Sequence, residues 1–236
     1  MTGPDDRVPD DVATLPAEGG GSDPSPTADP VDRPDPLASS AVVTRRGDDG
    51  STSLLYGGGR IAKDDPRTDA YGTVDEAVAA FGIARAELVE MERHGILPPA
   101  LAGLADVILG VQRDLFVVAA ELAASPDAWD RLQDGRTRVS PEMVDGLEAT
   151  IADLERRIRM PREFIVPGET RASAALELAR TVVRRAERRA VSLHRAGLVP
   201  GDCLLPYLNR LADLAWVLAR AEEQGEQRDA TPSRPR

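Results

Sequence analysis

An arginine-rich stretch, residues 180–189, has residue types and spacing suited to binding an anion. At about 100° per residue in a helix, Arg180, Arg184 and Glu187 fall within roughly 60° of one another, opposite small apolar residues. Guanidinium groups bind phosphates well because their planar fork of donors matches the oxygens and because they remain charged. The pattern therefore predicts a helix that packs on one face and binds phosphate on the other. A solvated face covered by salt bridges is the alternative interpretation.

A second stretch of interest lies upstream, between residues 44 and 76, and is rich in Gly, Asp, Ser and Thr. These residue types favour turns with exposed backbone N–H groups. Such groups, together with hydroxyls and the nearby Lys63, can hold a polyphosphate. The Gly-Lys-[Ser/Thr] ending of a Walker A loop is absent. From these residues alone, a polyphosphate-binding loop and a plain surface turn are equally supported.

Four sequence motifs occur in a fixed order along the chain, and together they are a stronger indication of family resemblance than any single motif. The first runs from Thr44 as Thr-x-x-Gly-Asp-x-Gly-x-Thr, Gly-Gly-x-Arg, Lys-Asp-x-x-Arg and Ala-Tyr-Gly-x-Val-Asp-Glu. The later blocks are Phe164–Gly168, Arg180–Arg188 and Leu208–Asp213. Over roughly residues 42–221 the chain thereby resembles the ATP:cob(I)alamin adenosyltransferases, a family of small trimeric helix bundles.

This resemblance implies a transferase that moves the 5′-deoxyadenosyl group of ATP to the cobalt of cob(I)alamin. Adenosylcobalamin and triphosphate would be the products, and ATP, Mg²⁺ and cobalamin the ligands. Reduced cobalt is itself the nucleophile, so the reaction requires no general base, and the chain offers only two histidines and one cysteine. The protein has to orient two large reactants and stabilise a charged leaving group. The alternative is an escort that binds adenosylcobalamin and delivers it to a mutase with little catalysis.

The resemblance also assigns roles to individual residues. The nucleotide loop comprises Thr44, Gly47, Asp48, Gly50, Thr52 and Lys63. On the arginine-rich helix, Arg184, Glu187 and Arg188 would contact the nucleotide, and Asn209 would lie near ATP and Mg²⁺.

The corrinoid side of the site is expected to contain an ion pair between Asp75 and Arg180. Phe164 is expected below the corrin ring, where it would exclude the dimethylbenzimidazole ligand and favour four-coordinate cob(II)alamin. Without the resemblance, Phe164 would be interpreted as a core residue and Asn209 as a hydrogen-bonding residue of a helix surface.

Other residues are given structural interpretations. Trp216 and Tyr207 are interpreted as packing residues, and Asp49 occupies a variable position of the loop. Two departures from the family pattern concern the corrinoid side: Ala77-Val78-Ala79 replaces a common Leu-Asn-Ser, and Glu177 stands where a His often precedes the arginine-rich helix.

Helical periodicity predicts the elements that position these residues. Five helices are expected, over residues 73–92, 98–124, 140–159, 170–196 and 202–223. His94 and His194 each precede a helix-ending glycine and are interpreted as helix C-terminal residues. The predicted fold is all-α, an up-and-down, ferritin-like five-helix bundle with an N-terminal nucleotide-binding loop, extended or in a short hairpin.

Composition sets the remaining expectations. The net charge is −11, of which residues 1–40, with nine acidic and two basic residues, account for −7. We expect a disordered acidic tail over 1–40, one domain over 41–223 and a disordered C-terminal tail over 224–236. No leader peptide, transmembrane segment or dominant basic patch is evident, so we expect a cytoplasmic protein that binds neither membranes nor nucleic acid. A homotrimer with transient contacts to a cobalamin reductase and a mutase follows from the resemblance.

Overall fold

The computed structural model describes residue 37 and residues 39–234 of the 236-residue chain. The chain divides into two units, residues 1–44 and residues 45–236, and each is described by itself. In the first unit, the Ser40 hydroxyl accepts hydrogen bonds from the backbone N–H groups of Val42 and Val43. The predicted disordered tail over 1–40 lies almost wholly outside the described residues and stays a prediction.

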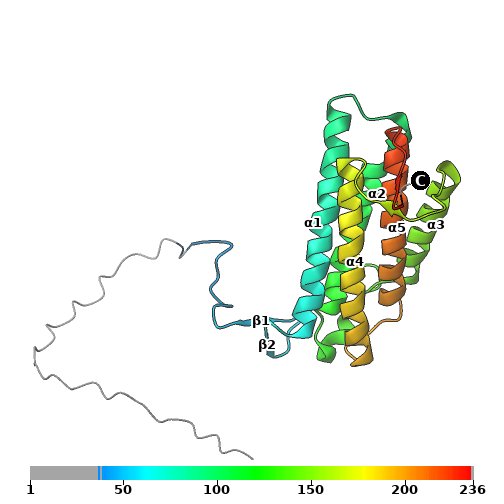
Figure 1. Ribbon diagram of the computed structural model, residues 1–236. Coiled ribbons are helices and arrows are strands. Elements are labelled where there is room, and N and C mark those ends of the chain that lie inside the picture. The colour runs from blue at the N-terminus through cyan, green and yellow to red at the C-terminus, as the bar shows by residue number, and fades with distance from the viewer. Residues whose placement is uncertain (1–36, 38, 235–236) are drawn as a thin grey trace, which may run out of the picture. The chain divides into compact units, whose positions relative to one another are not determined.

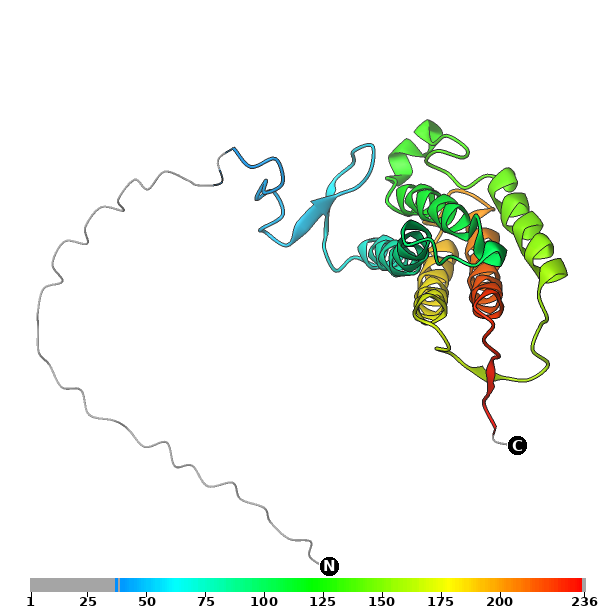
Figure 2. The same cartoon turned by 90° about the horizontal axis from the view of Figure 1, so that it is seen from above.

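The second unit is a helix bundle, which confirms the all-α prediction. Its helices are α1 (Pro66–Arg93), α2 (Leu104–Leu122), α3 (Pro141–Arg157), α4 (Arg171–Arg195) and α5 (Leu204–Gly225). Short 3-10 helices, η1 (Pro99–Leu101) and η2 (Pro126–Arg131), flank α2 (Figure 1). Helix α4 packs against both α1 and α5, whereas α2 covers α1 and α3 covers α5 (Figure 2). The arginine-rich sequence thus lies on a central helix of the bundle.

The apolar face predicted for the arginine-rich helix is the buried face of α4. Its small residues are all at most 7% exposed: Ala175, Ala179, Val182, Val183, Ala186 and Ala190. Small side chains let helices approach closely, and the removal of apolar area from water stabilises their contact by about 25 cal/mol per Å². Packing on both sides of α4 therefore fixes its rotation, and with it the direction of the arginines.

Ion pairs along α1 and α4 show that the two helices are antiparallel. Arg189 pairs with Asp69 at 2.7 Å, and Arg185 pairs with Glu76 further along α1. Near the other end, Arg171 approaches Glu87 at 3.6 Å. The alternative interpretation, a salt-bridged arginine face, is thus correct for the side of α4 that contacts α1.

Helix α1 begins at Pro66, earlier than the predicted Thr73. The Asp65 carboxylate accepts the backbone N–H of Arg67 at 2.9 Å, and Pro66 occupies the first turn, where its missing N–H costs little. The prediction was late because Gly72, a weak helix former, lies within the first turns. Gly103, with φ of +81°, divides the predicted second helix into η1 and α2.

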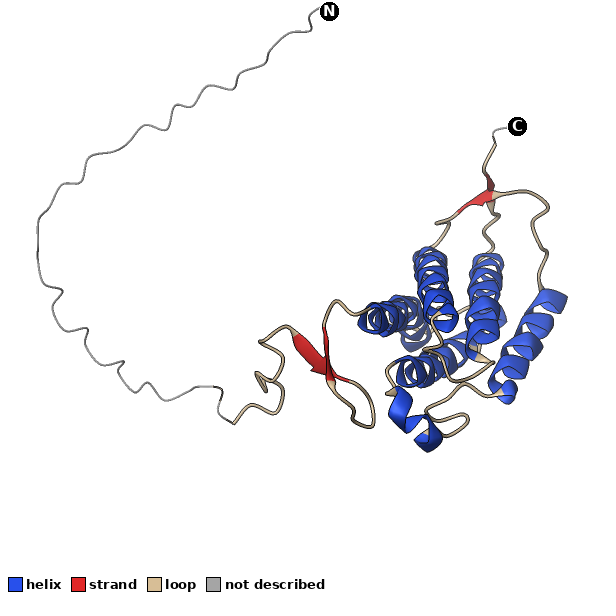
Figure 3. Ribbon diagram, turned by 90° about the horizontal axis from the view of Figure 1, so that it is seen from below, coloured by secondary structure: helices blue, strands red, loops and turns tan. Residues whose placement is uncertain are grey.

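Two small antiparallel ribbons complete the unit (Figure 3). Strand β1 (Ser51–Ser53) pairs with β2 (Arg60–Ala62), which confirms the predicted short hairpin. Strand β3 (Ile165–Val166) pairs with β4 (Thr231–Pro232). None of the helices in the described part of the chain is long and apolar enough to cross a membrane.

The pairing of β4 corrects the predicted tail over residues 224–236 as far as the structure describes it. Helix α5 continues to Gly225, and the side chain of Gln224 exchanges two hydrogen bonds, of 2.9 and 2.8 Å, with the backbone of Arg159. Polar composition had suggested an unstructured end. Backbone pairing with β3 stabilises the segment without requiring apolar side chains.

Candidate functional site

The predicted nucleotide loop folds around the side chain of Lys63. A methyl group on Gly47 would lie 3.0 Å from the Lys63 ammonium nitrogen, so the lysine crosses directly over this glycine. The backbone N–H of Lys63 donates to the carbonyl of Gly50 at 2.9 Å. Gly50 itself has φ of +77°, a conformation that favours glycine. The structure therefore brings together three of the predicted residues, Gly47, Gly50 and Lys63.

Asp49, interpreted from sequence as a variable position, shapes the turn of this loop. Its carboxylate accepts hydrogen bonds from the backbone N–H and the hydroxyl of Ser51, at 2.9 and 2.7 Å. These bonds lower the pKa of Asp49, and Arg60 lowers it further. Arg60 also donates to the Ser51 hydroxyl at 2.6 Å, which ties β2 to the turn. An Asp two residues before a Ser is a signal for such a turn that the sequence analysis did not use.

The remaining loop predictions have different outcomes. Thr52 lies in β1 opposite Ile61, and Asp48 is exposed. Thr44 belongs to the other unit, so its place relative to the loop stays a prediction.

The hairpin leaves the bundle at the start of α1 and is tied to the end of α2 (Figure 1). The backbone N–H of Leu55 donates to Ala123 at 2.8 Å, and Ser125 donates to Leu55 at 3.2 Å. The guanidinium of Arg131, on η2, stacks 4.7 Å from the centre of the Tyr56 ring. The unpredicted helix η2 thus has a role in holding the hairpin to the bundle.

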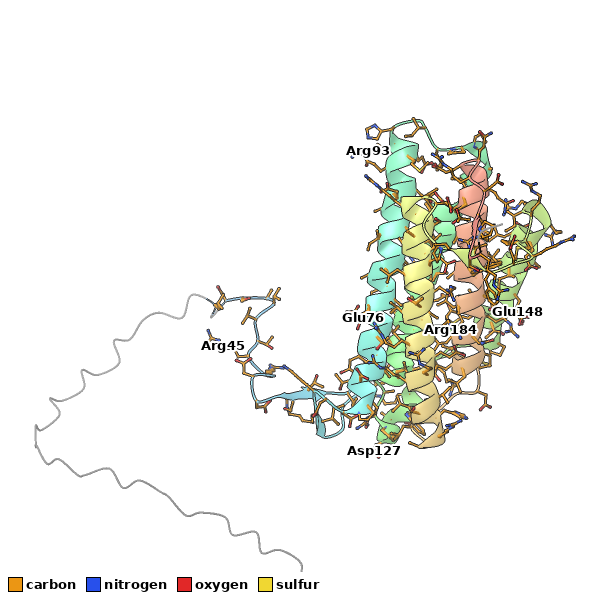
Figure 4. The ribbon with its side chains drawn as sticks, in the orientation of Figure 1. Arg45, Glu76, Arg93, Asp127, Glu148 and Arg184 are labelled. Atoms are coloured by element: carbon orange, nitrogen blue, oxygen red, sulfur yellow. The ribbon has the colours of Figure 1, made fainter. Side chains whose placement is uncertain are left out.

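On α4, the arginines away from α1 form the second part of the site. Arg184 is exposed and its guanidinium has no hydrogen bond or ion pair with any described residue. Arg188 donates to the backbone carbonyl of Arg184 at 3.1 Å. The amide of Asn209, on α5, donates to Glu187 at 3.3 Å, which brings two further predicted residues together. Arg210 donates hydrogen bonds to Asn209 and to Glu148 of α3. Figure 4 shows Glu148 on the same side of the bundle as Arg184.

Two cavities adjoin this arginine face and share Arg180 and Trp216 in their walls. One, of about 440 Å³, is lined by Arg184, Arg210 and Asp213 together with Ile151 and Met160. The other, of about 490 Å³, is lined by Phe164, Pro167 and Glu177. The structure thereby places Arg184 and Phe164 on opposite sides of a wall made by Arg180 and Trp216.

Trp216, interpreted from sequence as a packing residue, packs against the core and also lines both cavities. It is partly exposed, and its ring lies under the guanidinium of Arg220, 5.4 Å from the ring centre. A usable signal was its spacing, because it follows Asn209 by two helical turns and so lies on the same face of α5. Tyr207 is buried, as expected, and its hydroxyl donates to Asp114 at 3.1 Å.

Phe164 is 88% exposed, which excludes its alternative interpretation as a core residue. It immediately precedes β3, and its carbonyl accepts the backbone N–H of Ser233 at 2.8 Å. Its side chain lines the cavity that Arg180 and Trp216 also border.

The predicted ion pair between Asp75 and Arg180 does not form within the chain. Arg180 instead donates to Glu177 at 2.7 Å, one turn earlier on the same helix. Asp75 is exposed on α1 and has no ion pair with a described residue. The local pair forms because Glu177 is buried, and a buried carboxylate requires a cation nearby.

Comparison with known proteins agrees with this geometry. The family model described as cobalamin adenosyltransferase matches residues 42–222. The chain is 37% identical over 182 residues to a corrinoid adenosyltransferase of Citrobacter freundii, covering 77% of this chain and 94% of that one. It is 38% identical over 183 residues to the corrinoid adenosyltransferase PduO of Salmonella typhimurium, covering 78% of this chain and 50% of that protein.

A solved structure shares the fold. It is a variant of the PduO-type ATP:corrinoid adenosyltransferase from Lactobacillus reuteri, complexed with cobalamin and ATP. The TM-score is 0.69 at 28% identity, over 82% of this chain and 99% of that chain. These matches, together with the helix bundle, define an adenosyltransferase. The chain belongs to the cobalamin adenosyltransferase family.

Proposed function

We propose that this protein transfers the 5′-deoxyadenosyl group of ATP to the cobalt of a reduced corrinoid. The observation that carries the proposal is the exposed guanidinium of Arg184, which has no ion pair with a described residue and lines a cavity together with Trp216. Family membership supplies the reaction class. The cobalt attacks the ribose 5′ carbon, the carbon–oxygen bond to the triphosphate breaks, and triphosphate leaves with the bonding electron pair. No proton is transferred, so the site needs no general base.

The charge on the leaving triphosphate determines what the side chains have to do. Arg184 would stabilise that charge as it develops, because its donors have no competing partner among the described residues. Lys63, held over Gly47, would contact the phosphates together with the backbone N–H groups of the loop. Arg188 would add a second guanidinium one turn from Arg184.

The donor set near Arg184 also fits Mg²⁺ bound with ATP. Mg²⁺ in nucleotide sites is usually held by one or two protein oxygens plus phosphates and water. Glu187 and Asn209, joined by a hydrogen bond, supply such oxygens. The ion would neutralise part of the triphosphate charge, while these two residues hold it at the nucleotide.

The cavity lined by Phe164 is proposed to receive the corrinoid. Phe164 would contact the lower corrin face and exclude the dimethylbenzimidazole ligand, leaving cobalt four-coordinate and easier to reduce. Trp216, in the wall common to both cavities, would pack beside the corrin. This arrangement separates an apolar corrinoid side from a cationic triphosphate side.

The complete site is proposed to form between the subunits of a homotrimer. Within the described residues of one chain, no hydrogen bond or ion pair joins residues 47–63 to Arg180, Arg184 or Arg188. A loop from a neighbouring subunit would supply the missing contacts, and Asp75 would be available to a cation of that neighbour. We further place the protein in the cytoplasm, with a reductase supplying the reduced corrinoid and a mutase receiving the product.

The proposal is tested by mixing the protein with ATP, Mg²⁺ and chemically reduced cobalamin and following adenosylcobalamin formation by absorbance. Turnover with release of triphosphate is the expected result. A protein that binds adenosylcobalamin tightly but does not form it would instead be an escort, and the proposed activity would be wrong.

A further inference from the structure

A chain of four alternating charges crosses from α5 to α4 behind the two cavities. Arg220 donates to Glu223 at 2.8 Å and to Glu177 at 3.2 Å, and Glu177 in turn accepts from Arg180 at 2.7 Å. Arg220 and Glu223 are each 1% exposed, and Glu177 is 4% exposed. Glu177 and Arg180 both line the cavity beside Phe164, and Arg180, whose side chain is 28% exposed, also lines the cavity beside Arg184.

Stability alone does not account for this cluster. Burying several charges costs free energy that their mutual attraction only partly offsets, and apolar replacements are often as stable. The Nε atom of Arg220 is buried without a hydrogen-bond partner among the described residues, which adds to the cost. The buried charges are therefore more simply explained by the side chain that they hold in place.

The geometry at Arg180 supplies that explanation. Glu177 engages the inner nitrogen, Nε, and not the two terminal nitrogens of the guanidinium. Within the described part of the chain neither terminal nitrogen has a hydrogen bond or ion pair. Because the guanidinium is planar, fixing Nε also fixes the direction of the donor fork.

We propose that Glu177 is a positioning residue that holds the Arg180 fork toward the corrinoid cavity, and that Arg220 holds Glu177 in place. The fork would donate to amide carbonyls at the periphery of the corrin, since such carbonyls accept paired N–H donors. This inference rests on the proposed function, because it takes the cavity beside Phe164 as the corrinoid side.

The test compares Glu177→Gln with the wild type at saturating ATP and varied reduced cobalamin. Loss of a charged hydrogen bond that orients Arg180 should raise the KM for corrinoid about ten-fold. The kcat and the KM for ATP should change less than about two-fold, because Arg184 and Lys63 are untouched. Glu87→Gln is the matched control: it breaks the 3.6 Å pair with Arg171 between α1 and α4, and should leave all three parameters unchanged.

A double-mutant cycle separates positioning from a merely structural role. Arg180→Ala should raise the corrinoid KM, and adding Glu177→Gln to it should have no further effect on that KM. A structural role would instead lower kcat and the melting temperature in both backgrounds. If Glu177→Gln does not fold, the triple variant Glu177→Gln/Arg220→Met/Glu223→Gln replaces it, because it removes all three buried charges together.

The outcomes distinguish the two proposals. An unchanged corrinoid KM in Arg180→Ala would overturn both the positioning role and the placement of the corrinoid. A raised KM in Arg180→Ala with an unchanged KM in Glu177→Gln would overturn the positioning role alone. Equal, additive losses in the double variant would also overturn it.

Discussion

Lys63 lies across Gly47 so closely that a methyl group at position 47 would sit 3.0 Å from the lysine ammonium nitrogen. The same methyl group would lie 3.2 Å from the backbone carbonyl oxygen of Ser51. Side chain and backbone therefore close over the glycine from two directions. The absence of a side chain at position 47 is what lets the ammonium group remain at the centre of the loop.

The first prediction follows from this contact. Gly47→Ala should displace the Lys63 ammonium and raise the KM for ATP about ten-fold, the loss of roughly one charged hydrogen bond. Gly59→Ala, in the same hairpin, is the control, because no atom lies within 4 Å of its added methyl group. Steady-state kinetics with ATP varied measure both. Equal KM values for the two variants would show that Lys63 does not contact the nucleotide.

Arg184 gives the second prediction. Arg184→Ala should lower kcat by about 10²–10³ with ATP saturating, the usual effect of removing one preorganised donor to a developing negative charge. Arg195→Ala, at the exposed end of α4, should leave kcat within about two-fold of the wild type. A near-normal kcat in Arg184→Ala would remove this residue from the reaction.

A third relationship concerns stability. The Thr170 side chain, the N-cap of α4, accepts the backbone N–H of Ser173 at 3.0 Å and donates to the carboxylate of Glu222. Burial raises the pKa of Glu222 from its ordinary value of 4.5 to about 7, the Thr170 hydrogen bond lowers it in part, and Glu226 and Glu223 raise it further. The folded protein thus binds a proton more tightly at this site than the unfolded chain does.

The third prediction is that this protonated carboxyl makes the fold less stable as pH rises. The contribution of Glu222 is fully present below pH 4.5 and is lost as pH rises through about 7. The loss should be on the order of 2 kcal/mol, or about 4–8 °C in melting temperature for a domain of this size. In Glu222→Gln the melting temperature should vary less with pH, between pH 5 and 8, than it does in the wild type. The exposed Glu92→Gln should keep the wild-type pH dependence. Parallel pH profiles for wild type and Glu222→Gln would contradict the assignment.

The sequence predicted the helices well because their periodicity is strong and local. The six small residues expected on the packed face of α4 are all buried, since the spacing of Ala and Val decides which face packs. The predicted ends of helices and strands were less accurate where contacts with distant parts of the chain determine them. Strand β4 pairs with β3, which is distant in sequence, and no local sequence pattern around Thr231 predicts this pairing.

The candidate site was predictable only in part for a similar reason. The residues Gly47, Lys63, Arg184 and Asn209 have recognisable neighbours in sequence. Glu177 does not, because its contacts depend on which helices pack together. Arg180 was predicted to pair with Asp75, but the buried Glu177 one turn away is its partner within the chain. Such competition between partners is decided by burial, which sequence alone does not reveal.

The last prediction concerns assembly. Gly47→Trp should disable the loop and Arg184→Ala the arginine face, so each variant alone should be inactive. If every site combines the loop of one subunit with α4 of its neighbour, random exchange in an equal mixture should make about one quarter of the sites intact, because cyclic symmetry repeats the same interface. Activity should therefore recover to about a quarter of the wild-type value after exchange.

The recovery of activity has to be compared with an independent measurement of subunit exchange. Mass spectrometry of intact assemblies, with one variant isotopically labelled, would show when mixed trimers have formed. Each variant mixed with itself supplies the baseline and should remain inactive. Mixed trimers without activity would mean that each chain builds its own site, and that the loop reaches α4 of the same chain when ligands bind. Assemblies other than trimers in the same mass spectra would overturn the proposed stoichiometry.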